Sequence, residues 1–272
     1  MNQSFKKQKD FIVCIDSDGC AMDTMDIKHQ KCFGPYLVDV FDLKDSERFI
    51  EIWDRINLYS QTRGCNRFKG LVLSLEEYGY EGDFSRLQNW VATTNELSNR
   101  SLVKEIEKCG GKDLELALQW SEKVNIGIKT LREHDAPFNN VLRSMAIIKQ
   151  FADIAVVSSA NNEAIIDEWT RHGLLPFVDL VFGQDQGTKA FCLNHLREYG
   201  YQSKNILMVG DSPGDLDSAQ QAQTNFFPIL CKKEDESWDQ LVLEALGKLV
   251  YQDFNEEYQQ QLITKFNKNL VV

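Results

Sequence analysis

The chain has 272 residues, of which 43% are hydrophobic and 26% charged, and its net charge is −11. This size and composition are typical of a globular protein with one large domain or two smaller ones. The negative charge argues against nucleic acid or an anionic membrane surface as the main partner, because both attract basic patches. It is compatible with a small anionic substrate, which needs only a local positive site.

Seven cysteines are scattered at irregular spacings, without a Cys-x-x-Cys pair of the kind that binds zinc or forms a redox dithiol. The pattern favours reduced thiols, and we therefore expect a cytoplasmic protein. The charged N-terminal segment is followed by an apolar run too short for the core of a signal peptide. No run approaches the roughly 20 apolar residues of a membrane span.

Five short apolar runs have the length of β-strands. They are continuous and do not alternate with polar residues, as is typical of parallel strands covered by helices on both faces. Segments of helical length separate the last four runs, which is the βαβ pattern. Pro228 interrupts the last run and predicts an edge strand. The runs are Phe11–Ile15, Ile154–Val157, Val178–Phe182, Ile206–Val209 and Phe226–Leu230.

The long segment between the first and second runs has helical periodicity instead. Phe49, Trp53 and Ile56 follow one another at helical spacing, and a similar apolar stripe runs through residues 112–131. We expect no strand between Met25 and Pro137. The sequence therefore predicts an α/β fold, with a Rossmann-like parallel sheet core, helices on both of its faces and an inserted α-helical domain.

The predicted domain bounds follow from this division. The α/β core comprises residues 1–22 and 140–272, and the inserted helical domain comprises residues 23–139. A single large α/β domain with a helix-rich lobe is the alternative. The tail after Lys232 predicts one or two amphipathic helices that turn their apolar side chains to the core, namely Leu241, Leu246, Leu249 and Phe254.

Polar side chains directly follow three of the predicted strands. Asp16-Ser17-Asp18-Gly19 follows the first, Ser158-Ser159 the second, and Gly210-Asp211-Ser212-Pro213-Gly214-Asp215 the fourth. In an open parallel sheet, the residues after the strand ends meet in one crevice, where such folds bind ligands. A cluster of aspartates needs a cation, and oxygen ligands without histidine or cysteine favour Mg²⁺. Taken singly, each motif could also be an ordinary turn or helix cap.

Together these motifs resemble those of the haloacid dehalogenase-like hydrolase superfamily. "DSDGC" is similar to its first motif, Asp-x-Asp-Gly-(Thr/Val), "VVSSA" to its second, and "GDSPGDLDSA" to its fourth, Gly-Asp-x-x-x-Asp. The lysine expected between the second and fourth motifs is best matched by Lys189 in "GQDQGTKAF". The resemblance covers about half of the chain, and the helical insertion matches the family's cap domain.

The resemblance implies a role for each motif residue. Asp16 would attack phosphorus and form an aspartyl-phosphate, and Asp18 would act as general acid and then as general base. Ser158 would bind a phosphoryl oxygen, and Lys189 would neutralise the phosphoryl group and Asp16. Mg²⁺ would be held by the Asp16 carboxylate, the Asp18 backbone carbonyl and Asp211, with Asp215 nearby or in an outer shell.

Asp18 distinguishes between branches of the superfamily. The carbon–halogen branch lacks an aspartate there and needs no metal, so the resemblance implies phosphate chemistry. The Asp-Lys-Thr-Gly pattern of ATP-driven pumps is also absent. Cys20 departs from the usual Thr or Val. We expect it to affect packing, with a redox-sensitive thiol as the alternative.

The segment "YSQTRGCNRFKG", residues 59–70, is the best candidate for substrate recognition in the cap. It carries Arg63, Arg67 and Lys69 without an acidic residue, and its two glycines indicate a partly looped segment. The alternative is a solvated turn with ordinary surface charges. Ser159 is a further candidate for substrate binding. Asp23 is placed near the hinge or the site entrance, and His29 is the weakest candidate, because a lone histidine is usually a surface or packing residue.

The leading hypothesis is an Mg²⁺-dependent phosphatase acting on a small phosphorylated metabolite. A phosphotransferase such as a sugar-phosphate mutase needs the same core and differs in how its cap excludes water. A phosphonate hydrolase would need a cap lysine placed to form a Schiff base. A non-catalytic phospho-ligand binder is disfavoured, because it would need neither Asp16 nor Asp18. The natural substrate and the oligomeric state are not specified by the sequence.

Overall fold

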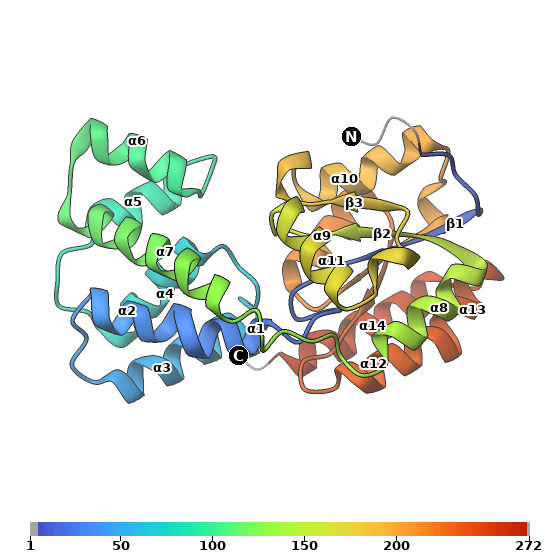
Figure 1. Cartoon of the computed structure of the whole chain (residues 1–272), viewed down its shortest axis with the longest axis horizontal. Coiled ribbons are helices and arrows are strands. Elements are labelled where there is room, and N and C mark those ends of the chain that lie inside the picture. Colours follow the sequence, from blue (N-terminus) through green and yellow to red (C-terminus); the bar gives the residue numbers. More distant parts are fainter. Residues whose placement is uncertain (1–4, 271–272) are drawn as a thin grey trace. The chain divides into compact units, whose positions relative to one another are not determined.

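A computed structural model describes residues 5–270 of the chain and contains one parallel sheet of five strands. The strand order is β3-β2-β1-β4-β5, so the chain moves to one side of β1 first and to its other side afterwards (Figure 1). This arrangement confirms the predicted fold class. The strands are β1 (Phe11–Ile15), β2 (Ala152–Val157), β3 (Leu180–Phe182), β4 (Ile206–Gly210) and β5 (Asn225–Pro228).

The strands lie where the apolar runs predicted them. β1 has the predicted bounds, and the others differ by up to two residues at either end. β5 is at the edge of the sheet, as Pro228 predicted, and Pro228 itself is the last residue of that strand, in register with Gly210. A proline is tolerated there because it interrupts no interior ladder of hydrogen bonds.

Helices cover both faces of this sheet. Since βαβ crossovers are right-handed, the reversal of strand order at β1 requires the crossover helices between β3 and β5 to lie on the face opposite to those before β3. The helices of this part of the chain are α8 (Val141–Phe151), α9 (Asn162–Arg171), α10 (Lys189–His195), α11 (Pro213–Ala222), α12 (Glu234–Gln240), α13 (Leu246–Val250) and α14 (Glu256–Asn269). Shorter helical turns are η3 (Leu175–Phe177), η4 (Gln184–Gln186), η5 (Leu196–Tyr199), η6 (Ser203–Asn205) and η7 (Leu241–Ala245).

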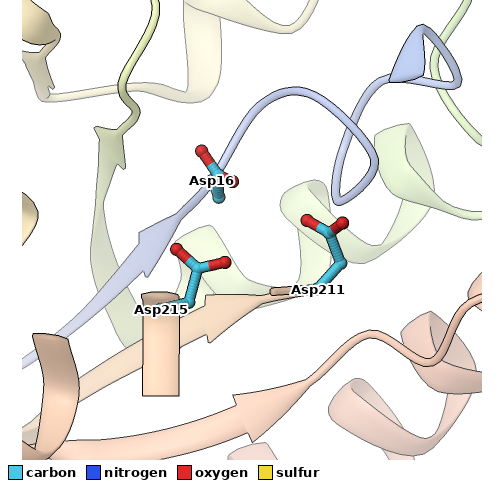
Figure 2. Close-up of side chains that lie close together, drawn as sticks. All are labelled: Asp16, Asp211 and Asp215. Atoms are coloured by element: carbon cyan, nitrogen blue, oxygen red, sulfur yellow. The ribbon is translucent and has the colours of Figure 1, made fainter. Parts of the chain in front are cut away.

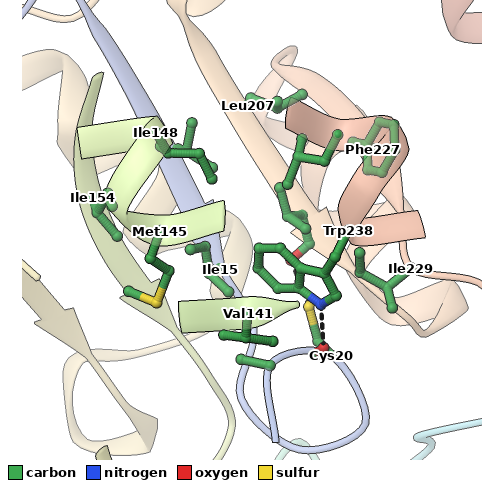
Figure 3. Close-up of a cluster of buried hydrophobic side chains, with 14 of the residues drawn as sticks. Ile15, Cys20, Val141, Met145, Ile148, Ile154, Leu207, Phe227, Ile229 and Trp238 are labelled. Carbon is green, nitrogen blue, oxygen red and sulfur yellow. Dashed lines mark hydrogen bonds between the residues drawn. The ribbon is translucent and has the colours of Figure 1, made fainter. Parts of the chain in front are cut away.

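One hydrophobic core fills the space between the sheet and α8, α9 and α12 to α14. Ile15, Ile154 and Leu207 contribute from three neighbouring strands, and Trp169 and Trp238 contribute from α9 and α12. The C-terminal helices bury Leu241, Leu246 and Leu249, and Phe254 packs against the same core (Figure 3 shows part of it). The tail therefore belongs to the core in the way that its apolar periodicity predicted.

The inserted segment is helical, and within it the structure contains no strand between Met25 and Pro137. Its buried interior is rich in aromatic rings, including Phe49, Trp53 and Trp120. Its helices are α1 (Met25–Lys28), α2 (Gly34–Val40), α3 (Ser46–Asp54), α4 (Arg67–Tyr78), α5 (Ser85–Thr93), α6 (Asn99–Cys109) and α7 (Lys112–Thr130), with π-helical turns η1 (His29–Phe33) and η2 (Arg55–Tyr59).

The contacts of the chain divide it into two compact units. We call residues 5–24 and 135–270 the sheet unit, and residues 25–134 the helical unit. Residues 23–24 and 135–139 thus group with the sheet, whereas the predicted bounds assigned them to the helical domain. Residues 1–4 and 271–272, at the two ends of the predicted core, lie outside the described residues. That each unit is an independent domain stays a prediction.

No helix within residues 5–270 combines the length and the apolar character needed to cross a membrane.

The chain leaves and re-enters the sheet unit along a short ribbon of backbone hydrogen bonds. Asp23 N donates to Ala136 O at 2.7 Å, and Phe138 N donates to Ala21 O at 3.1 Å. Asp135, at the start of the returning segment, receives two hydrogen bonds from the Arg171 guanidinium at 2.7 and 2.6 Å. Such a bidentate pair restricts orientation as well as distance, and it anchors the ribbon to the end of α9.

A buried carboxylate at the other end of the sheet anchors the N-terminal segment. Asp153 in β2 is fully buried, and its Oδ2 accepts hydrogen bonds from the backbone N–H groups of Gln8 and Lys9, both at 2.9 Å. The Tyr201 hydroxyl donates to the same oxygen at 2.5 Å. These donors replace the water that the carboxylate loses on burial.

Removing one of these donors tests the anchor. We expect Tyr201→Phe to lower the free energy of unfolding by about 1–3 kcal/mol, because the buried carboxylate loses a donor without gaining another. Urea titration measures this difference. Tyr251→Phe is the matched control, since Tyr251 is 85% exposed and its variant should unfold like the wild type. Equal stability of the two variants would contradict the proposed anchor.

Candidate active site

The candidate site lies where the order of the sheet reverses. β1 and β4 are neighbours, and the chain leaves them toward opposite sides. Open α/β folds bind ligands in a crevice beyond the carboxyl ends of such strands. Asp16 is the first residue after β1, and Asp211 is the first after β4. Asp16 N donates to Val209 O at 3.0 Å, which continues the pairing of the two strands up to the catalytic candidates.

Three buried aspartates come together in this crevice. Asp16, Asp211 and Asp215 each offer a carboxylate oxygen, and these atoms lie within 4.8 Å of one another (Figure 2). The predicted convergence of the first and fourth motifs is therefore present in the structure. A set of oxygen donors at this spacing, without nitrogen or sulfur donors, suits Mg²⁺ better than a transition metal.

Lys189 supplies the positive charge that this cluster needs. It is the first residue of α10, and Thr188 caps that helix by accepting a hydrogen bond from Phe191 N at 3.1 Å. Lys189 Nζ lies 2.9 Å from Asp16 Oδ2 and 2.5 Å from Asp215 Oδ1. Burial opposes the charged amine, but the two carboxylates outweigh this effect and raise the pKa of Lys189, so the side chain stays protonated.

At Asp16, unlike at Lys189, the effect of burial on the pKa exceeds the effect of the opposite charge. Burial raises the pKa of its carboxyl group, the Lys189 charge lowers it, and the negative charge of Asp215 raises it again, to a result of about 6. In the absence of a cation, the charged form of Asp16 is therefore less favoured than for an exposed aspartate. A bound divalent cation would favour the deprotonated form that a nucleophile needs.

Asp215 is oriented from two sides. Its Oδ2 accepts hydrogen bonds from Ser212 N at 3.1 Å and Ser212 Oγ at 2.7 Å, in a capping box at the start of α11. Its Oδ1 faces Lys189. Gly210 makes this position accessible, because a Cβ added there would lie 2.4 Å from Asp215 Cβ. In this geometry Asp215 holds the lysine, while Asp16 and Asp211 offer oxygen atoms beside it.

Asp18 is half-buried and is held through a residue that the sequence interpretation did not include. Thr24 Oγ1 donates to Asp18 Oδ1 at 2.5 Å, and Thr24 is itself buried. Gly19 has a φ of 78°, which glycine adopts without strain, and this allows the chain to turn sharply after Asp18. The only sequence signal for Thr24 is its place shortly after the first motif, and a hydroxyl residue there has no chemical pattern of its own.

Ser158 and Ser159 follow β2, the other neighbour of β1. Ser158 is buried, its N–H donates to Phe182 O at 2.9 Å, and its Oγ accepts a hydrogen bond from Ala160 N at 3.2 Å. Ser159 is exposed. The structure thus places Ser158 at the carboxyl edge of the sheet, with a hydroxyl proton that it can donate to a further acceptor.

The basic segment of residues 59–70 lies in the helical unit. Arg63 is buried and donates to Leu58 O at 2.6 Å. Arg67 begins α4 and donates to the side chains of Ser121 and Asn125, at 3.1 and 2.7 Å. Lys69 is exposed. Both arginines therefore have structural contacts within the helical unit, and substrate binding by this segment stays a prediction.

The structure also shows the surroundings of Cys20, His29 and Asp23, three residues that the sequence analysis considered. Cys20 is fully buried beside the sheet, and burial raises the pKa of its thiol well above the ordinary range, which favours packing over redox sensing. His29 accepts a hydrogen bond from the Trp53 indole at 3.1 Å and stacks on Phe33, so it packs in the helical unit. Asp23 is exposed and lies in the ribbon that leaves the sheet unit.

Comparison with known proteins agrees with this geometry. The family model described as haloacid dehalogenase-like hydrolase matches residues 65–229, which is more than half of the chain. The chain therefore belongs to the haloacid dehalogenase-like hydrolase family. The matched segment contains Ser158, Lys189, Asp211 and Asp215, whereas the first motif with Asp16 and Asp18 precedes it. No curated protein matches the chain significantly.

A solved structure of low sequence identity shares the fold. A predicted phosphoglycolate phosphatase from Haemophilus somnus has a TM-score of 0.52 and 15% identity, over 81% of this chain and 84% of that one. A haloacid dehalogenase-like hydrolase from Streptococcus pneumoniae has a TM-score of 0.48 and 12% identity, over 80% of this chain and 83% of that one.

A substitution at Gly210 tests the close approach of Asp215. We expect Gly210→Ala to displace Asp215 from Lys189 and to lower the free energy of unfolding by about 1–3 kcal/mol, because the added methyl group overpacks the site. Gly247→Ala is the control, since a Cβ there would meet no atom within 4 Å. Urea unfolding of both variants measures the difference, and a Gly210 variant as stable as the control would show that the contact is easily relieved.

The raised pKa of Asp16 predicts a pH dependence of stability without metal. Because the folded-state pKa of about 6 exceeds the ordinary value of 3.8, Asp16 contributes stability at low pH that is lost as the pH rises through 6. In EDTA, we expect the wild type to lose on the order of 1 kcal/mol relative to Asp16→Asn between pH 5 and pH 7.5. Parallel pH profiles of unfolding for the two proteins would contradict this assignment.

Proposed function

We propose that this protein is an Mg²⁺-dependent phosphatase that hydrolyses small phosphorylated metabolites through an aspartyl-phosphate on Asp16. The observation that carries the proposal is the buried constellation at the switch point of the sheet. Lys189 lies within hydrogen-bonding distance of Asp16 and Asp215, and Asp211 lies beside them. Membership of the hydrolase family supports the reaction class, and the half-buried Asp18 two residues after Asp16 supports phosphoryl chemistry.

In the first step, an Asp16 carboxylate oxygen attacks phosphorus and the bond from phosphorus to the leaving oxygen breaks. Lys189 reduces the repulsion between the attacking carboxylate and the anionic phosphoryl group. Asp18 donates a proton to the leaving oxygen as it departs. Thr24, which donates to Asp18 Oδ1 at 2.5 Å, keeps this carboxyl group at the edge of the crevice. The products are an alcohol and Asp16 carrying the phosphoryl group.

In the second step, a water molecule attacks phosphorus and Asp18 takes up its proton. The bond between phosphorus and the Asp16 oxygen breaks, which releases inorganic phosphate and restores the carboxylate. In this proposal, Ser158 donates a hydrogen bond from its hydroxyl group to a phosphoryl oxygen in both steps. The Asp16 and Asp215 carboxylates keep Lys189 protonated in the free site. In the intermediate, Asp215 and the anionic phosphoryl group provide the negative charge beside it.

The residues fit Mg²⁺ as the cation of this site. Asp16, Asp211 and the backbone carbonyl of Asp18 would hold it, with Asp215 behind them keeping Lys189 in place. When bound, the ion supplies positive charge that offsets the phosphoryl oxygens and orients them for in-line attack. Because the chain has a net charge of −11, an anionic substrate needs local positive charge of this kind.

Phosphate release from a broad panel of phosphorylated metabolites tests the proposal, in EDTA and with added Mg²⁺. We expect Mg²⁺-dependent release from one chemical class, and a loss of at least about a thousandfold in kcat for Asp16→Asn, since the nucleophile is removed. Asp217→Asn is the matched control, because this exposed aspartate of α11 lies two residues beyond Asp215. It should turn over like the wild type.

Two results would contradict the proposal. Release that is equal for the wild type and Asp16→Asn would exclude Asp16 as the nucleophile. Absence of release from every compound, with Mg²⁺ binding shown by calorimetry, would exclude a simple phosphatase. Acid-stable trapping of radiolabelled phosphate on the wild type but not on the Asp16 variant would support the covalent step independently of which substrate is used.

A further inference from the structure

The loop that carries the two catalytic candidates is wound around one backbone carbonyl. Ser17 O accepts hydrogen bonds from the N–H groups of Cys20, Ala21 and Met22, at 3.3, 3.0 and 2.8 Å. Ser17 stands between Asp16 and Asp18 in the chain. A displacement of this compact turn would therefore move both carboxyl groups together. We call residues 16–22 the catalytic loop, a name that rests on the proposed function.

A buried tryptophan of α9 holds the first part of the catalytic loop. The Trp169 indole N–H donates to Ser17 Oγ at 2.9 Å, across 152 positions of the sequence. Both side chains are buried, with exposures of 0% and 1%. An unpaired indole N–H at this depth would cost free energy, so the serine hydroxyl is a required partner and not an incidental neighbour.

A second buried tryptophan holds the later part of the same loop. The Trp238 indole N–H of α12 donates to Cys20 O at 3.0 Å, across 218 positions of the sequence (Figure 3). Trp238 is also fully buried, and it belongs to the same hydrophobic core as Trp169. The catalytic loop is thus connected to two helices that come from different parts of the chain.

These two contacts have a functional consequence because residues 16–18 of the loop have no apolar side chain that could fix their position. The later part of the loop packs in the core through Cys20, Ala21 and Met22, which are fully buried. Each tryptophan combines a large, rigid, well-packed ring with one directional donor. It therefore fixes the position of a single loop atom relative to the core. Catalysis by positioning is sensitive to small displacements, since a misplacement of about 1 Å can cost roughly a hundredfold in rate.

We propose that Trp169 and Trp238 are positioning residues of the active site, which hold Asp16 and Asp18 in the geometry for phosphoryl transfer. They act through Ser17 and Cys20 and do not touch the substrate. Removing either donor leaves the packing nearly intact when the replacement is phenylalanine, but it releases one end of the loop. The effect therefore falls on turnover and not on substrate binding.

Three single substitutions separate positioning from general core stability. Trp169→Phe and Trp238→Phe each remove one donor to the catalytic loop. Trp120→Phe is the matched control, because Trp120 is also fully buried and its indole donates to Phe33 O at 2.9 Å within the helical unit. We expect similar losses of thermal stability in all three, but a fall of about tenfold in kcat, with KM within about twofold, only in the first two.

A double-mutant cycle tests the Trp169 contact directly. Ser17→Ala should lower kcat about as much as Trp169→Phe, and the double variant should lose little more than either single variant, because one shared hydrogen bond is lost once. Losses that multiply would mean that the two residues act independently, and this would overturn the proposed role of the bond.

Amide hydrogen exchange provides a readout that does not depend on turnover. We expect peptides covering residues 16–22 to exchange about tenfold faster in the Trp169 and Trp238 variants, and like the wild type in the Trp120 variant. If the wild type proves inactive while this pattern holds, the proposed function fails and the positioning stands. Unchanged exchange in the loop, or an equal loss of kcat in all three variants, would overturn the positioning proposal itself.

Discussion

The structure of the site depends on one interaction, the placement of the Lys189 ammonium group between two buried carboxylates. The carboxylates of Asp16 and Asp215 would repel each other, and both lose hydration on burial. The lysine at 2.9 and 2.5 Å compensates them, but it does not do so fully, because the pKa of Asp16 still rises to about 6. Three carboxylates and one lysine leave an excess of negative charge in this cluster, and this excess supports the proposed Mg²⁺ site.

The elements around the crevice all contribute to this arrangement. α10 begins at Lys189, so its first side chain projects toward the strand ends, and the capping box of α11 turns Asp215 toward it. Gly210 leaves the space for that approach. The reversal of strand order between β1 and β4 then brings Asp16 and Asp211 to the same place. The local signals that begin α10 and α11 and the strand order of the sheet thus bring Lys189 and the three aspartates together.

In the sheet unit, the strands and the catalytic loop are held in position in different ways. The strands are buried on both faces and fix the backbone as far as Asp16 and Asp211. Beyond that point the chain must turn, and the catalytic loop depends on side chains for its position, through Trp169, Trp238 and Thr24. In the proposed function, the residues of the family motif are the groups that react, and residues outside the motif hold them in position.

The sequence by itself determined the five strands, the edge position of β5, the helical insertion and the motif residues at the strand ends. Each of these depends on local pattern, namely continuous apolar runs, helical periodicity and a proline, and such patterns act over a few residues. Lys189 was also predictable, since it begins a helix between two motifs. Its partner contacts were not, because they join residues from separate segments of the chain.

Only the tertiary structure decided the hydrogen-bond partners of Trp169, Trp238 and Thr24. The same is true of the contacts that Arg63 and Arg67 make within the helical unit. Tryptophan in an apolar helix predicts burial, but the acceptor of its N–H comes from a residue 152 or 218 positions away. The two arginines looked like surface charges available to a substrate, yet both donate to atoms of the helical unit. Directional hydrogen bonds between distant segments leave no periodic pattern in the sequence, and they exist only once the elements have packed.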